Sequence, residues 1–136
     1  MSTAGYSGTP LAKKLGIKPG FRVRTTNVPA DYEDLLRPIP EDVSFSSRFR
    51  QPVEIWHLFT KKKSELEKHL KVARTRIISD GMVWVSWPKK SSGIPSEVTE
   101  DTVREIALPL GLVDVKVCAV DETWSGLKLV IRKELR

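Results

Sequence analysis

Cysteine is nearly absent from this sequence. Cys118 is the single cysteine among 136 residues, so no disulfide can form within the chain. No cluster of cysteine and histidine is present either, which excludes a structural zinc site. A chain of this length buries enough surface to fold without a metal or a disulfide. Because a lone cysteine is typical of a reducing compartment, we expect a cytoplasmic protein.

Long apolar runs are also missing. No stretch approaches the roughly 20 apolar residues that a membrane span requires, and the N-terminal residues lack the apolar run of a signal peptide. We therefore expect no membrane partner. The pattern G-x-x-x-x-G-K-[ST] does not occur, which excludes a P-loop.

Positive charge is what the sequence has in excess. The formal net charge is +6 and the isoelectric point is about 9.6, which favours an anionic partner. The cations are scattered rather than gathered in one stripe. They include Lys13, Lys14, Arg22, Arg24, Arg48, Arg50, Lys61, Lys62, Lys63, Lys89, Lys90, Arg132 and Lys133. Nucleic acid, a small anionic ligand and an acidic protein all fit this distribution.

The stretch from Met82 to Gly93 organises the rest of the chain. Its apolar run, MVWVSW, shows no alternation of polar and apolar residues, which is typical of a strand that helices cover on both faces. Asp80-Gly81 predicts a turn that starts this strand, and Pro88 predicts its end.

The loop after this strand is the best candidate for a binding site, because ligands of open α/β sheets bind beyond the carboxyl ends of the strands. It combines two ammonium groups with hydroxyls and a flexible glycine, which together can hold a phosphate or carboxylate. The predicted ligand-binding residues are Asn27, Trp87, Lys89, Lys90, Ser91, Ser92 and Gly93. A solvated basic loop is the alternative, and packing of Trp87 in the core is favoured over contact with a ligand.

The remaining elements follow from hydrophobic spacing. Helices are expected at Leu11–Leu15, at 31–36 with Asp31 as cap, and from Thr99. A further helix is expected after a capping box formed by Ser64 and Glu67. Its buried face should consist of Leu66, Leu70, Ala73 and Ile77. Further strands are expected at Phe21–Thr25, Val43–Phe45, Val53–Phe59, Leu112–Val120 and Leu127–Lys133. In the strand after Leu112, Val113, Val115, Val117 and Ala119 are expected to share one face.

This order of elements predicts a three-layer, Rossmann-like α/β sandwich of about six strands. The sheet should be mostly parallel, with an antiparallel C-terminal hairpin, because the turn between the last two strands is short. Residues 1–136 are expected to form a single domain, with residues 1–10 as a flexible N-terminal arm.

Other reactive residue types have structural interpretations. Asp121 and Glu122 are adjacent carboxylates in a predicted hairpin turn, where such pairs usually do no chemistry. His57, inside an apolar strand, is expected to be a core histidine. Cys118 has no base beside it in the sequence and is interpreted as structural. No catalytic or metal-binding residue is therefore nominated, and the sequence favours a non-enzyme.

Two resemblances arise from these motifs. The order strand, helix, DG-containing strand, helix and antiparallel hairpin resembles the C-terminal half of class I S-adenosylmethionine-dependent methyltransferases. The segments YSGTPLAKKLGIKPG, DGMVWVSWPKKSSG and LPLGLVDVKVCAVDETWSGLKLVIRK resemble a bacterial family of small proteins that is known only as a domain of unknown function. The second resemblance covers nearly the whole chain and implies no activity.

The first resemblance implies a glycine-rich loop after the first strand and an acidic ribose-binding residue after the second. Thr25–Asp31 contains no glycine, and only Glu41 or Asp42 could be nominated for the acidic residue. We therefore expect a Rossmann-like module that binds a small anionic, nucleotide-like ligand without strong catalysis, with no cofactor identified. The alternatives are a nucleic-acid-binding accessory protein, a residual methyltransferase-like protein and a homodimeric scaffold.

Overall fold

The structure is a computed structural model and describes residues 8–136. Six strands form one sheet in the order β2-β1-β3-β4-β6-β5. The strands are β1 (Arg22–Thr26), β2 (Ser44–Ser46), β3 (Val53–Phe59), β4 (Ile77–Pro88), β5 (Leu112–Ala119) and β6 (Trp124–Ile131). The helices are α1 (Leu11–Lys14), α2 (Tyr32–Leu36), α3 (Lys63–Arg76) and α4 (Glu100–Ala107), with short 3₁₀ turns η1 (Lys90–Ser92), η2 (Leu108–Leu110) and η3 (Lys133–Leu135).

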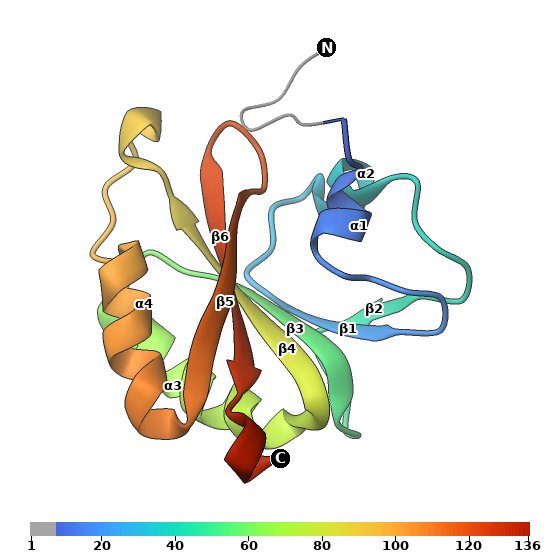
Figure 1. Ribbon diagram of the computed structural model, residues 1–136. Coiled ribbons are helices and arrows are strands. Elements are labelled where there is room, and N and C mark those ends of the chain that lie inside the picture. The colour runs from blue at the N-terminus through green and yellow to red at the C-terminus, as the bar shows by residue number, and fades with distance from the viewer. Residues whose placement is uncertain (1–7) are drawn as a thin grey trace.

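Helices cover the sheet on both faces, α3 and α4 on one and α1 and α2 on the other (Figure 1). Strands β2, β1, β3 and β4 are parallel, while β6 runs antiparallel to both β4 and β5. The predicted three-layer sandwich with an antiparallel terminal hairpin is thus confirmed. The predicted N-terminal arm lies outside the described residues except for Gly8, Thr9 and Pro10.

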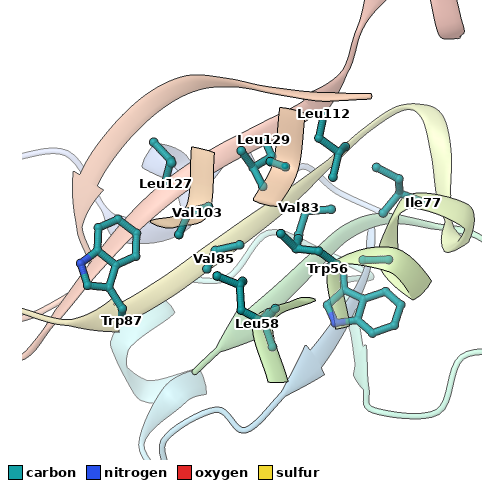
Figure 2. Packing of buried hydrophobic residues seen from close by; sticks show 14 of the residues in the cluster. Trp56, Leu58, Ile77, Val83, Val85, Trp87, Val103, Leu112, Leu127 and Leu129 are labelled. Atoms are coloured by element: carbon teal, nitrogen blue, oxygen red, sulfur yellow. The ribbon is translucent and has the colours of Figure 1, made fainter. Parts of the chain in front are cut away.

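Strand β4 is buried on both faces, as its unbroken apolar run predicts. Val83, Val85 and Trp87 pack into the cluster beneath α3 and α4, where Figure 2 shows them beside Leu127 and Leu129 of β6. Trp84 faces the opposite way, is fully buried in the cluster beneath α1 and α2, and donates its indole N–H to the carbonyl of Leu15 at 2.9 Å.

The predicted turn at Asp80-Gly81 is wrong, because β4 continues through both residues. The pairing of β3 with β4 shifts in register between Val53 and Ile55. At Gly81 an added Cβ would lie only 2.9 Å from the carbonyl oxygen of Glu54. Glycine is therefore needed here for a close approach of two strands rather than for a turn.

The predicted capping box at Ser64 and Glu67 is also wrong. Helix α3 begins at Lys63, whose backbone N–H is bonded at 2.9 Å to the carboxylate of Glu97 from a distant loop. A long-range partner thus replaces the local cap. At the other end of the helix, Ile77 belongs to β4.

The predicted starts of α4 and α2 had different outcomes. The predicted helix start at Thr99 is confirmed, and Thr99 is the cap of α4, since its hydroxyl accepts the backbone N–H of Thr102. Asp31 precedes α2 but makes no capping bond with its side chain. Because α2 has only one and a half turns, its place depends on packing of Tyr32 and Leu36 rather than on a cap.

Strand β5 does not keep one apolar face, contrary to the alternation of its sequence. Its register with β6 shifts between Asp114 and Lys116, which leaves an extra residue, Val115, in β5. After this bulge the faces exchange. Lys116 lies opposite Lys128, while Val117 lies opposite Leu127 and remains 49% exposed.

A polar network crosses the core between α2, β3 and β4. His57 is fully buried, and its Nδ1 lies 2.8 Å from the hydroxyl of Tyr32 while its Nε2 lies 2.8 Å from the hydroxyl of Ser86. The predicted core histidine is therefore present and is satisfied by two side chains. Burial lowers the pKa of His57 to about 3, so the ring is neutral in the folded protein.

Packing of α3 against the sheet can be tested at Leu70, which is fully buried. Replacing it with alanine removes apolar contacts and leaves a cavity, so Leu70→Ala should lower the free energy of unfolding by about 2 to 5 kcal/mol. The matched control is Val72→Ala on the same helix, where Val72 is 42% exposed and the loss should stay below about 0.5 kcal/mol. Urea titration measures both, and equal losses would contradict this packing.

The neutral state of His57 predicts a pH dependence of stability. The folded pKa, about 3, lies below the value of about 6.5 expected in the unfolded chain. Between these pH values only the unfolded state binds the proton. The free energy of unfolding should therefore decrease by up to about 1.4 kcal/mol for each unit by which the pH is lowered.

The comparison is with His57→Gln, which should be less stable at neutral pH but should show a shallower decline toward acid. His69→Gln is the control, because His69 is partly exposed on α3 and should leave most of the slope unchanged. Urea titrations of the three proteins at several pH values measure the slopes. A slope that His57→Gln leaves unaltered would refute this explanation.

Candidate functional site

The predicted lysine loop borders a hollow at the carboxyl end of β4, which we call the β4 hollow. Its volume is about 340 Å³, and Trp87, Lys89 and Lys90 line it together with Thr99 and Ser125. Strand β4 ends at Pro88, and the backbone N–H of Lys89 is then bonded to the carbonyl of Thr123 at 2.8 Å. The hairpin turn between β5 and β6 therefore fixes the start of the lysine loop.

The other predicted loop residues shape the loop rather than line the hollow. The Ser92 hydroxyl donates to the carbonyl of Lys89 at 2.6 Å and accepts the N–H of Ile94 at 3.1 Å. Gly93 follows η1 with φ of 76°, a left-handed conformation that favours glycine. Ser91 is exposed. Trp87, Lys89 and Lys90 thus line the same hollow, whereas Ser92 and Gly93 stabilise the turn that follows.

The first turn of α4 contributes to the β4 hollow, which the sequence analysis did not anticipate. Thr99 and Glu100 line it, and the first backbone N–H groups of a helix carry partial positive charge. The Glu100 carboxylate in the same hollow forms an ion pair with Arg104. The Arg104 guanidinium also binds Asp114 at 2.9 Å, and these hydrogen bonds raise its pKa.

Ser125 could have been found from the predicted antiparallel hairpin. Strand β6 begins where β4 ends, and Ser125 lies directly opposite Trp87. A residue at the start of the last strand must therefore lie beside the lysine loop. Trp87 itself is only 7% exposed, so it is mainly a core residue that presents one edge to the hollow.

Asn27 lies apart from the lysine loop, at the end of β1. It has φ of 57°, and its side-chain amide donates to the carbonyl of Phe59 at the end of β3. Because β3 separates β1 from β4, Asn27 is not part of the β4 hollow. A second hollow of about 510 Å³ lies next to the end of β1, lined by Val28, Pro29 and Tyr32 among others, and we call it the β1 hollow.

The resemblance to class I methyltransferases implies a glycine-rich cofactor loop after the first strand, so the residues of the β1 hollow test whether S-adenosylmethionine fits there. The loop after β1 presents Val28, Pro29 and Ala30, whose side chains fill space that a glycine loop would leave to the ligand. Glu41 and Asp42 precede β2 and so lie at the opposite edge of the sheet. The residues at this position therefore do not fit S-adenosylmethionine as that fold family binds it.

The remaining reactive groups have structural contacts. One carboxylate oxygen of Asp121 accepts the backbone N–H groups of Thr123 and Trp124, both at 2.8 Å, and so closes the hairpin turn. Cys118 is half-buried, and burial raises the pKa of its thiol although Lys14 and Lys116 act in the opposite direction. A raised pKa keeps the thiol protonated and unreactive.

Neither a bilayer span nor a metal cluster is found between Gly8 and Arg136. The helices in this part of the chain are too short or too polar to cross a membrane. The same residues contain no group of three or more acidic, histidine or cysteine side chains that could hold a metal ion.

Solved structures with a similar fold include several methyltransferases. A SAM dependent methyltransferase from Aquifex aeolicus superposes with a TM-score of 0.67 at 16% identity, covering 89% of this chain and 88% of that one. The N-methyltransferase NodS from Bradyrhizobium japonicum WM9 has a TM-score of 0.59 at 9% identity, with 85% and 88% covered. Magnesium protoporphyrin IX methyltransferase from Synechocystis PCC 6803 has a TM-score of 0.57 at 8% identity, with 89% and 74% covered.

At these identities the likeness concerns the fold alone. No curated protein matches the sequence. The family described as "Protein of unknown function (DUF3052)" matches residues 12–133, which include every described helix and strand except the first residue of α1 and the last two residues of η3. The chain belongs to this family of unknown function, and it has the fold of the class I methyltransferases.

Proposed function

We propose that this protein binds a small anionic, nucleotide-like ligand in the β4 hollow, without strong catalysis. The observation that carries the proposal is the convergence of Lys89, Lys90 and the start of α4 on one hollow at the carboxyl edge of a parallel sheet. Ligands of open α/β sheets bind at this edge. Two ammonium groups and a helix N-terminus all favour a negatively charged group there.

The nucleotide-like character of the ligand depends on Trp87. An indole edge beside two lysines provides an apolar surface next to a site for phosphate, which is the combination that a nucleotide presents. Ser125 adds a hydroxyl to the lining of the hollow that can donate to a sugar or phosphate oxygen, whereas the Ser96 hydroxyl already donates to the carbonyl of Val98.

The proposal of weak or no catalysis rests on the roles of the reactive side chains. His57 is enclosed between Tyr32 and Ser86, and Asp121 closes a turn. Glu100 is the carboxylate that lines the β4 hollow, and it is paired with Arg104. A general base must accept a proton from the ligand and must lie within hydrogen-bond reach of it. None of these three groups meets both conditions. A cytoplasmic location is part of the proposal and rests on the single cysteine.

Tryptophan fluorescence tests the proposed ligand site, because Trp87 lines the hollow. Nucleoside mono-, di- and triphosphates and inorganic phosphate should each be titrated into the protein. We expect a saturable change with at least one of them. Lys89→Ala combined with Lys90→Ala should weaken the binding at least tenfold, since each charge-assisted hydrogen bond contributes about 1.5 to 3 kcal/mol.

The matched control is Lys68→Ala combined with Lys71→Ala, which removes the same charge from the exposed face of α3. This control should bind like the unaltered protein. The proposal fails if no titrant changes the fluorescence, or if both double variants weaken binding equally.

Isothermal calorimetry with S-adenosylmethionine separates this proposal from a residual methyltransferase. Because the loop after β1 does not fit the cofactor, we expect no saturable heat at concentrations where methyltransferases bind it. Binding that survives Lys89→Ala with Lys90→Ala would place the cofactor in the β1 hollow and would favour the methyltransferase alternative.

A further inference from the structure

A second basic surface lies far from the β4 hollow, on the face of the sheet that carries α1. It consists of Lys13 and Lys14 of α1, Lys18 of the following turn, Lys116 of β5 and Lys128 of β6, and we call it the β5 lysine cluster. Three of these lysines line a hollow of about 470 Å³ together with Thr9, Val117, Cys118 and Ala119. Among residues 8–136, no acidic residue lines this hollow.

The pairing of β5 with β6 places two of these lysines directly opposite each other. Lys116 and Lys128 are cross-strand partners, so their side chains leave the same face of the sheet. Like charges in this arrangement destabilise a sheet. The bulge at Val115 produces the pairing, because without the shift in register Lys116 would face the other way.

The repulsion is not relieved by acidic side chains. The ion pairs found within residues 8–136 are made by arginines, and Lys18, Lys116 and Lys128 have no carboxylate partner there. Lys116 instead donates to the carbonyl of Lys14 at 3.3 Å. Partial burial lowers the pKa of Lys128, and the charges of Lys116 and Lys18 lower it further.

The neighbouring elements explain why this face can receive a ligand. Helices α1 and α2 pack mainly over β1, β3 and β4 (Figure 1), and α1 reaches β5 at its C-terminal end, where Lys116 is bonded to the carbonyl of Lys14. Lys13, Lys18 and Lys116 of the cluster are exposed, so their charges can reach a ligand. The cations of the cluster come from four separate segments of the chain.

We propose that the β5 lysine cluster binds the phosphate backbone of a nucleic acid strand, independently of base sequence. Charge complementarity supports this occupant, because a strand supplies regularly spaced phosphates to a surface of spaced cations. Lysine is suited to such contacts because its ammonium group can donate to phosphate oxygens in many directions. Phosphate contacts of this kind carry no sequence information.

The test measures binding of a fluorescein-labelled single-stranded oligonucleotide by anisotropy, at salt concentrations between about 50 and 200 mM. The variant is Lys116→Gln with Lys128→Gln. Each phosphate contact contributes about 0.7 to the slope of log K against log salt for single strands, so the variant should bind more weakly with a slope shallower by about 1.4.

Two controls separate this cluster from general basicity and from the proposed ligand site. Lys68→Gln with Lys71→Gln removes the same charge from α3 on the opposite face and should leave the slope unchanged. Lys89→Ala with Lys90→Ala should abolish the nucleotide response while oligonucleotide binding persists. Unfolding in urea checks the cluster variant, which should be at least as stable as the unaltered protein because a like-charge pair is removed.

Four outcomes would overturn the proposal. The first is an unaltered protein that does not bind the oligonucleotide, and the second is an α3 control that changes the slope as much as the cluster variant does. Loss of binding only in the Lys89 and Lys90 variant would assign the anion to the β4 hollow. Tighter binding to phosphatidylserine vesicles than to the oligonucleotide, with the same dependence on Lys116 and Lys128, would assign the cluster to a membrane surface.

Discussion

Burial of β4 on both faces is the constraint on which the rest of the structure depends. Val83 and Val85 need a cover on one side and Trp84 needs one on the other, so helices must lie on both faces of the sheet. The strand is also where the sheet changes direction, because β3 pairs with it in parallel and β6 pairs with it antiparallel. The residues at the carboxyl end of β4 therefore lie between a parallel neighbour, β3, and an antiparallel neighbour, β6.

Polar groups specify how the second face of the sheet is assembled. The hydroxyls of Tyr32 and Ser86 hold the two nitrogens of His57, and the Trp84 indole is bonded to the carbonyl of Leu15. Each of these buried groups would cost free energy if it lost its partner. The bonds thus fix α1 and α2 on the sheet although both helices are very short.

The two basic surfaces differ in how their charge is balanced. In the β4 hollow the lysines share the space with Glu100, which is bonded to Arg104, and with the first turn of α4. In the β5 lysine cluster Lys116 and Lys128 lie opposite each other in the sheet, and the described part of the chain places no acidic residue in the adjoining hollow. The first surface suits a compact ligand in a defined orientation, whereas the second suits an extended anion.

Local physics explains what the sequence alone determined. The strand Val53–Phe59, the end of the central strand at Pro88 and the helix start at Thr99 depend on residues close together in the chain, and all three were predicted correctly. The lysine loop was identified for the same reason. Its hollow also needs Ser125, which follows only from the antiparallel pairing of β6 with β4.

Only the tertiary structure decided the features that depend on distant partners. Glu97 replaces the local cap that Ser64 would have made, and the backbone of Glu54 explains Gly81. Because of the bulge at Val115, the alternating apolar residues of β5 do not all lie on one face of the sheet. The bulge also places Lys116 directly opposite Lys128. Periodicity describes one strand at a time, whereas register is a property of two strands, so no pattern within β5 could show which of its side chains would meet.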